Sequence, residues 1–348
     1  MYKRQGQSIR FGTGDAWYPD SHSTEEYEYY YALDPNVVWL PFFAEQPNIN
    51  NPGHLLWDYW LPLFTLLDTF HVQPTSDLLL TTLDPWCVPN NPARSCYDLT
   101  TKFLPLLGAN PNSFSSIHDF RLIESSSTKP KGIDLVCAEH GLAGIGMLTD
   151  HGIKKHGQLR EDYKKVHNVG RGGQIWDFRN FMLSNLGITN SQVLPKPLKV
   201  TFSLNSSNNP SRRRDFQKQV QTTKQLFEAY RGEIEVKSVI MGELSLMEQI
   251  SIVRESAVFI SVMGGSACTA MFLERDTSLI LYYNDIDDFA QGASKDGGKI
   301  PNRMDWDFWN NASFLRVYWL PISTMDEEKD LNTLTRLVKN EIRLRRLI

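Results

Sequence analysis

Residues 258–273, VFISVMGGSACTAMFL, decide the fold class of the second half of this chain. Val258–Met263 is a short apolar run rich in β-branched residues, which predicts a buried strand. Gly264 and Gly265 then permit a tight turn, and Ser266–Leu273 has the composition of a short helix. A buried strand that leads through a glycine turn into a helix is typical of parallel α/β sheets.

The same alternation surrounds this unit. We predict further strands and helices, in chain order, at Leu198–Leu204 (strand), Arg212–Tyr230 (helix), Ile234–Ile240 (strand), Ser245–Ser256 (helix) and Ser278–Tyr283 (strand). Strands that alternate with helices indicate a parallel sheet with right-handed crossovers, and therefore a Rossmann-like domain.

The first half shows a looser version of this pattern. Strands are predicted at Val37–Phe42, Asp77–Leu83 and Ile133–Glu139, and helices at Pro52–Phe70 and Trp176–Leu186. Asn51 is a suitable N-cap for the first helix, with Pro52 at its first position. Asp150–Gly173 has little apolar content, and we interpret it as a loop that could act as a lid.

Length and composition limit the function classes. A chain of 348 residues suggests two domains, and Pro195 and Pro197 mark the expected boundary. With 41% hydrophobic residues and a net charge of -4, the chain is a packed protein rather than a general nucleic-acid binder. It contains no apolar run long enough to span a membrane, and none of its cysteines is spaced as CxxC. Cys87 and Cys96 are either a disulfide or two unrelated thiols.

The first five residues, MYKRQ, resemble a translated sequencing adapter and are excluded from fold reasoning. We therefore expect the natural start to be missing, together with any signal or membrane anchor.

The Gly264–Gly265 turn and Ser266 form the first candidate site. A glycine turn at a helix N-terminus lets backbone N–H groups approach a phosphate closely. The alternatives are a plain turn and a hydrolase elbow with Ser266 as nucleophile. In that hydrolase fold a catalytic histidine follows the serine, whereas all eight histidines here precede Ser266.

Ser211-Arg212-Arg213-Arg214 follows the first strand of the second domain. Open α/β sheets bind ligands at this edge, and arginine can hold a phosphate through two hydrogen bonds. The alternative is a solvated basic segment, although positive charge at a helix start is unfavourable. A ligand is therefore the preferred interpretation.

Two acidic residues lie further along. Ser245 and Glu248 have the spacing of a capping box, so Glu248 is expected to be structural. Glu243 precedes that cap at the sheet edge and is a candidate to accept hydrogen bonds from a ribose.

His54 and Asp58 are four residues apart at the start of the first long helix, so they share a face. A carboxylate beside an imidazole raises its basicity, which suits a general base for a hydroxyl group. A helix-start histidine beside a surface aspartate explains the spacing equally well.

Asp285-Ile286-Asp287 follows a predicted strand and forms a D-x-D pattern, which could hold Mn²⁺ or Mg²⁺ through a nucleotide diphosphate. Such patterns also arise by chance, and Asp305-Trp306-Asp307 is a second instance.

Four segments together resemble glycosyltransferase family 61, which includes EGF-domain O-GlcNAc transferase and plant xylosyltransferases. They are listed here in chain order: Asn51-Pro52-Gly53-His54 with Asp58, Ser211-Arg212-Arg213, Glu243–Gln249, and Val262–Ser266 with Phe272. The sequence departs from the family where Met263 replaces a histidine and Gly265-Ser266 replaces Ala-Gly.

The resemblance implies a GT-B fold of two facing Rossmann-like domains, 6–195 on the acceptor side and 196–322 on the nucleotide-sugar side. A crossover helix, 323–348, would pack back on the first domain. It further implies an inverting transfer without metal or cofactor, from a UDP-linked donor to a glycan or protein hydroxyl, in the Golgi or endoplasmic reticulum lumen. His54 and Asp58 would be catalytic, while Arg212, Arg213, Glu243, Gly264, Gly265 and Ser266 would hold the donor. The alternatives are a degenerate binding protein of the same fold and a D-x-D enzyme.

Overall fold

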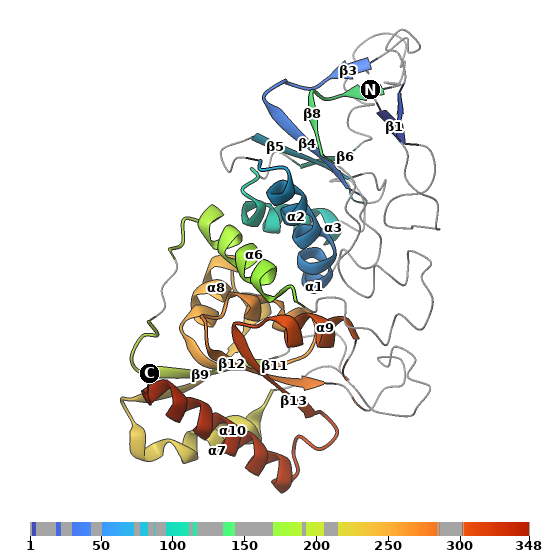
Figure 1. Ribbon diagram of the computed structural model, residues 1–348. Coiled ribbons are helices and arrows are strands. Elements are labelled where there is room, and N and C mark those ends of the chain that lie inside the picture. The colour runs from blue at the N-terminus through green and yellow to red at the C-terminus, as the bar shows by residue number, and fades with distance from the viewer. Residues whose placement is uncertain are drawn as a thin grey trace. The chain divides into compact units, whose positions relative to one another are not determined.

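The computed structural model describes residues 2–4, 19–21, 30–42, 51–72, 77–82, 87, 95–110, 114–116, 135–142, 170–189, 193–204, 215–283, 285, 301 and 303–347 (Figure 1). The chain divides into two compact units. The first comprises Met1–His167 and Asn180–Ile188, and the second comprises Asn168–Arg179 and Thr189–Ile348. Both units contain a parallel sheet, so the predicted α/β class is confirmed.

The sheet of the second unit has the order β10-β9-β11-β12-β13. Its strands are β9 (Leu198–Leu204), β10 (Ile234–Ile240), β11 (Ser256–Val262), β12 (Thr277–Tyr283) and β13 (Leu315–Pro321). All neighbouring strands run parallel. The chain moves outward from β9 to β10 on one side and then through β11, β12 and β13 on the other. The point where this direction reverses, between β9 and β11, is where such sheets bind ligands.

Helices cover both faces of this sheet (Figure 1). One face carries α7 (Gln217–Leu226) and α10 (Glu328–Leu347), and the other carries α8 (Leu246–Arg254), the 3₁₀ helix η11 (Gly265–Phe272) and α9 (Arg303–Asn311). Successive residues of a strand face opposite sides of the sheet, so the buried apolar residues of β11 pack toward the helices on both faces.

The C-terminal helix corrects the sequence-based expectation. Residues 323–348 were expected to pack on the first domain, but α10 belongs to the second unit. Its buried residues Leu334, Val338 and Ile342 join the core formed with Ile260 and Ile280 of the sheet. The helical spacing predicted the apolar stripe correctly, but the stripe packs on the sheet of its own unit.

The first unit contains a smaller parallel sheet of order β6-β5-β4-β8. Its strands are β4 (Val37–Phe42), β5 (Asp77–Thr82), β6 (Phe114–Ser116) and β8 (His140–Gly141). The predicted helix after β4 is present in three pieces, α1 (Pro52–His54), a π-helical stretch η4 (Leu55–Trp60) and α2 (Leu61–Thr69). Asn51 caps it by accepting a hydrogen bond from the Gly53 N–H, at 2.9 Å.

Further elements of the first unit are α3 (Ser95–Phe103) and the 3₁₀ turn η5 (Leu104–Leu107). The strand expected at 133–139 is the shorter β7 (Leu135–Cys137), which pairs with β3 (Tyr30–Ala32) rather than with the main sheet. An antiparallel pair joins β1 (Tyr2–Arg4) to β2 (Pro19–Ser21).

Cys87 and Cys96 form a disulfide, with their Cα atoms 5.4 Å apart and both side chains buried. In the described part of the chain, no helix has the length and apolarity needed to cross a membrane.

Candidate functional site

Three loops leave the sheet of the second unit at one edge. β9 lies between β10 and β11, and all three run parallel. Their carboxyl ends therefore lie side by side. The loop after β9 contains Arg212 and Arg213, the turn after β10 contains Glu243, and the turn after β11 contains Gly264 and Gly265. The topology thus brings together, at the switch-point edge of one sheet, the ends of the three strands that precede the predicted donor-binding segments.

The turn after β11 has a backbone that glycine alone adopts easily. Gly264 has φ 107° and ψ -156°, in a region that side chains with a Cβ rarely enter. A Cβ on Gly264 would meet no atom within 4 Å, so the requirement for glycine comes from backbone conformation rather than from crowding. η11 begins directly after it and is confirmed as the predicted short helix, in 3₁₀ form. Gly265 is its first residue, and Ser266 follows, whose side chain lies outside the described atoms.

A buried hydroxyl lies close to this edge. Ser203, the second-to-last residue of β9, is fully buried, and its Oγ has no hydrogen-bond partner within the described part of the chain. Its neighbour on the same face, Thr201, bonds Ser256 through its hydroxyl at 2.7 Å. A buried hydroxyl without a protein partner usually bonds an ordered water or a ligand. The sequence analysis did not identify Ser203, because a small polar residue in a strand is no signal by itself.

The basic segment 211–214 lies outside the described residues, so the positions of Arg212 and Arg213 remain predictions. The described chain resumes at Asp215 and Phe216. Phe216 has a φ of 53°, which is unusual for a residue with a side chain. Its buried ring packs between Phe202 of β9 and Tyr282 of β12, with centroid distances of 5.8 and 5.4 Å. Phe216, two residues after the basic segment in the sequence, is thereby anchored over the carboxyl half of the sheet.

Glu243 ends a 3₁₀ turn, Met241–Glu243, and its side chain is exposed. The neighbouring Ser245 and Glu248 form the predicted capping box at the start of α8. Their hydrogen bonds hold the pKa of Glu248 below its ordinary value, chiefly through the Ser245 hydroxyl. Glu248 is therefore structural, and Glu243 keeps an exposed carboxylate at the edge.

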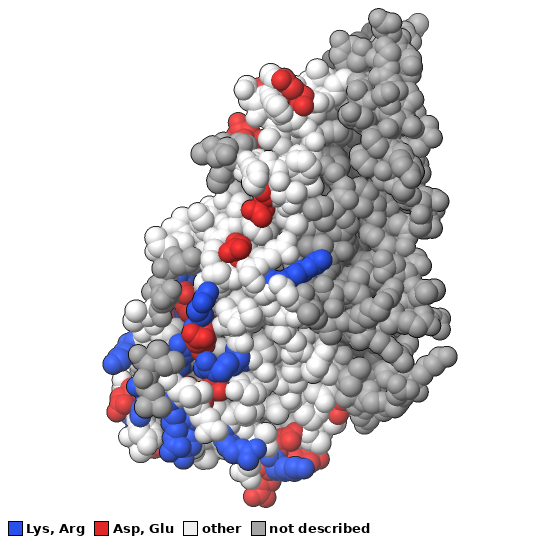
Figure 2. All heavy atoms as spheres, in the orientation of Figure 1, with Lys and Arg blue, Asp and Glu red and all other residues white. Residues whose placement is uncertain are grey.

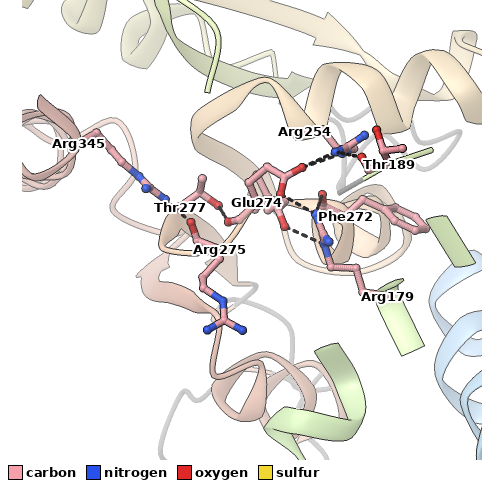
Figure 3. A network of polar contacts seen from close by, with 9 residues as sticks. Arg179, Thr189, Arg254, Phe272, Glu274, Arg275, Thr277 and Arg345 are labelled. Carbon is pink, nitrogen blue, oxygen red and sulfur yellow. Dashed lines mark hydrogen bonds and ion pairs between the residues drawn. The ribbon is translucent and has the colours of Figure 1, made fainter. Parts of the chain in front are cut away.

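A polar network holds the far end of η11 (Figure 3). The buried Arg179 of α6 (Gly172–Asn185) donates to the carbonyls of Phe272 and Leu273 at 3.1 and 3.0 Å. It also pairs with Glu274 at 3.1 Å, and Arg254 pairs with the same carboxylate at 2.7 Å. Burial lowers the pKa of Arg179 to about 10, while the Glu274 charge opposes this shift.

This network holds the C-terminal end of η11, the helix that follows the Gly264 turn. It also ties the first half of α6 to the second unit, where Trp176 stacks against the guanidinium of Arg179 at 4.5 Å. The sequence analysis missed Arg179, because its partners are backbone carbonyls far along the chain.

His54 lies at the end of α1 in the first unit and is half-buried. Asp58 lies inside the π-helical stretch, and its side chain is not among the described atoms. Hydrogen bonds in a π-helix span five residues rather than four, so the predicted sharing of one face does not follow from the backbone. Short π-helical stretches occur frequently at functional sites. The pairing of His54 with Asp58 stays a prediction.

The first aspartate of the D-x-D pattern, Asp285, has a structural role. The buried Asp285 follows β12 and accepts hydrogen bonds from the Ser323 backbone N–H, at 2.8 Å, and from the Ser323 hydroxyl. Asp287 lies outside the described residues. Within the described ranges, no group of three or more histidine, cysteine or acidic residues could hold a metal ion.

On the face drawn in Figure 2, basic and acidic side chains of the described residues both gather over the second unit, near α7 and α10. The two signs are interspersed there, so this face has no extended field of a single sign.

No protein-family model and no curated protein matches the sequence. Among solved structures, the chain is similar to the E. coli heptosyltransferase WaaC with ADP-2-deoxy-2-fluoro heptose, at 11% identity and a TM-score of 0.37, covering 87% of this chain and 99% of that one. It is also similar to the iron-containing dodecameric glycosyltransferase TibC from enterotoxigenic E. coli, at 10% identity and 0.35, with 89% and 77% covered. A glycosyl transferase family 9 protein from Veillonella parvula matches at 10% identity and 0.33, with 90% and 98% covered.

Proposed function

We propose that this chain is a glycosyltransferase that moves a sugar from a nucleotide diphosphate sugar, expected to be UDP-linked, to a glycan or protein hydroxyl. The observation that carries the proposal is the shared carboxyl edge of β9, β10 and β11, where the exposed Glu243 follows β10 and the Gly264 turn follows β11. The basic segment 211–214 follows β9 in the sequence. A diphosphate needs cationic and N–H donors, and a ribose needs an acceptor for its hydroxyls.

The proposed chemistry is an inverting displacement at the anomeric carbon. The acceptor oxygen forms a bond to this carbon as the bond to the diphosphate oxygen breaks, through a transition state with oxocarbenium character. Arg212 and Arg213 stabilise the negative charge that develops on the leaving diphosphate, together with backbone N–H groups of Gly264–Ser266. These donors replace a metal ion in the proposed mechanism, which therefore requires none.

The acceptor hydroxyl has to lose a proton in this reaction. We assign that proton to His54 or Asp58 of the first unit, because imidazole and carboxylate are the usual general bases at neutral pH. This assignment rests on residue type, on the position of His54 in the helix after β4, and on the resemblance stated above.

The Cys87–Cys96 disulfide supports a lumenal location, the endoplasmic reticulum or the Golgi, because disulfides persist in oxidising compartments and are rare in the cytosol. Cysteine oxidation in protein isolated from its native cell tests this part of the proposal. Free thiols at both positions would contradict it.

Calorimetric titration of UDP into Arg212→Ala and Arg213→Ala variants tests the donor site. Each lost charged hydrogen bond is expected to weaken binding about tenfold or more. Arg343→Ala is the matched control, because Arg343 is an exposed arginine on α10. Unchanged affinity in both site variants would remove the basic loop from the site.

Turnover with a panel of UDP-sugars, with and without EDTA, tests the reaction. His54→Asn and Asp58→Asn should lower turnover while UDP affinity stays unchanged. His71→Asn is the control, because His71 is an exposed histidine at the end of the same helix and its φ of 51° suits asparagine. Turnover that EDTA abolishes would favour the D-x-D alternative, and binding without turnover would favour a degenerate binding protein. Full turnover in both variants would show that neither residue is the base.

A further inference from the structure

Two tryptophans of the second unit form an aromatic pair, of which Trp306 is exposed and Trp319 is half-buried. Trp306 lies on α9 with 37% of its surface exposed, and its ring centroid is 5.4 Å from that of Trp319 on β13. The Trp319 indole N–H donates to the Asn310 amide oxygen at 3.0 Å. Asn310 is exposed and lies one helical turn after Trp306, so the two side chains share a face of α9.

Strand register places this pair beside the proposed donor site. Trp319 pairs with Leu281 of β12, and Leu281 pairs with Ser261 of β11. Residues paired across parallel strands lie in one row and face the same side of a sheet. Ser261 is three residues before Gly264, so Trp319 lies near the same edge and about 10 Å across the sheet, two strand spacings from β11.

The face is also shared with the helix that follows the glycine turn. Residues facing the other side, such as Ile280 and Tyr282 of β12, belong to the core under α7 and α10, whereas Leu281 does not. Trp319 therefore points to the side that carries α8 and α9 (Figure 1). The tryptophan pair and the donor turn are on one face, near one edge, within one unit.

The size of the patch indicates the kind of ligand. The other exposed large apolar side chains among the described residues lie on elements other than α9 and β13: Phe70, Val193, Tyr230, Met247 and Leu344. A protein partner would be expected to bury a wider apolar area. One exposed indole that packs on a second indole and lies beside an amide instead suits a saccharide. The indole can contact the apolar face of the sugar ring, and the amide can bond the ring hydroxyls.

We propose that Trp306, Trp319 and Asn310 form a platform on which a sugar ring of an acceptor oligosaccharide stacks. This inference rests on the proposed function and narrows its acceptor from glycan or protein to glycan. The sugar attached to the diphosphate has to lie directly beside the glycine turn. A ring held two strands away therefore belongs to the acceptor chain.

Binding of free oligosaccharides to the full chain tests this proposal. Xylotetraose, mannotetraose and chitotetraose are each titrated while tryptophan fluorescence is recorded, with calorimetry in parallel. We expect at least one of them to bind, Trp306→Ala to weaken that binding about tenfold, and Trp306→Phe to restore part of it. Met247→Ala is the control, because Met247 is also exposed in the second unit, on α8.

Two results overturn the platform: failure of all three saccharides to bind the unaltered chain, or equal binding by Trp306→Ala. Because Trp306 packs on Trp319, its removal should lower the unfolding midpoint by a few degrees, while a cooperative unfolding transition and UDP affinity are retained. These measurements exclude misfolding as the cause. UDP affinity is measured on the same samples. Saccharide binding without UDP binding would refute the donor site and support the platform. UDP binding without saccharide binding would support the donor site and refute the platform.

Discussion

The two edges of the second sheet carry different kinds of polar group among the described residues. At the amino edge, the buried Glu341 of α10 accepts from Ser278, from Arg316 at 2.6 Å and from Tyr318 at 2.5 Å. Glu274 lies between two arginines just before β12. At the carboxyl edge, Ser203 has an unpartnered hydroxyl among the described residues, Glu243 is exposed and Gly264 has a positive φ that glycine adopts easily.

This difference between the edges indicates that the amino edge contributes to stability and the carboxyl edge to ligand binding. Buried charges remain ionised only when they are paired and hydrogen-bonded, so the amino edge is built to hold the layers together. Unsatisfied polar groups and unusual backbone angles concentrate where a ligand supplies the missing contacts. Variants at the two edges should therefore change different measured quantities.

The largest expected effect is on stability. Glu341→Gln leaves Arg316 without its carboxylate and turns an amide N–H₂ toward donor groups, so we expect a loss of about 2–3 kcal/mol in urea unfolding. UDP affinity of the folded fraction should not change. Glu328→Gln, an exposed change on the same helix, is the control and should cost about 0.5 kcal/mol or less. Equal losses in the two variants would contradict a special role for the amino edge.

Substitution of two matched glycines, one at each edge, tests the difference between the edges directly. Gly264 and Gly232 have φ values of 107° and 89°, and an added Cβ would meet no atom within 4 Å at either position. Gly232 lies just before β10, at the amino edge. Gly264→Ala and Gly232→Ala should each lose about 1 kcal/mol of stability. Only Gly264→Ala should also weaken UDP binding, by about tenfold, as measured by calorimetry. Weakened UDP binding in both variants would show that the effect is global.

A smaller effect is expected at Glu243. Glu243→Gln removes a charged acceptor for ribose hydroxyls, and UDP affinity should fall several-fold, corresponding to about 1 kcal/mol. Binding of inorganic pyrophosphate should remain unchanged, because pyrophosphate carries no ribose. An equal loss of affinity for UDP and for pyrophosphate would show that Glu243 acts through its charge alone and does not contact the ribose.

The smallest expected effect is a pH dependence at the amino edge. Burial alone would raise the pKa of Glu341, but hydrogen bonds from Ser278, Tyr318 and Arg316 outweigh it and hold the pKa below its ordinary value of 4.5. The unfolded chain therefore binds the proton first, so the stabilisation is complete above pH 4.5 and is lost as the pH falls through the lower folded value. Unfolding curves above and below pH 4.5 should show the gap between the unaltered chain and Glu341→Gln closing in acid. A constant gap would contradict this.

The sequence predicted most of the second sheet, because β9, β10, β11 and β12 are contiguous apolar or alternating runs. It did not predict α9, in which aspartates and asparagines break the apolar pattern, and it left the largely apolar run of β13 unassigned. The helix expected over 212–230 begins only at Gln217, because Phe216 turns back to pack between Phe202 and Tyr282. Local composition cannot reveal a contact between segments so far apart in the chain.

The sequence predicted the separate segments of the candidate site but not the long-range contacts around them. Glycine pairs, basic runs and capping boxes are local signals, and the topology brings the strands that precede three of these segments together. Arg179 and Ser203 were missed because their significance comes from burial and from long-range partners. The packing of α10 was predicted wrongly, because an apolar stripe shows that a helix is covered but does not identify what covers it.

Strand β10 ends the second sheet and pairs with β9 alone among the described residues. Its outer backbone groups would favour pairing with another copy of the chain, which is the usual route to edge-to-edge aggregation. Glu235 and Lys237 interrupt this strand with charge of both signs. Self-association through β10 would remove these charged side chains from water, which opposes the pairing. The distribution of charge along this one strand therefore bears on how the protein stays dispersed at high concentration.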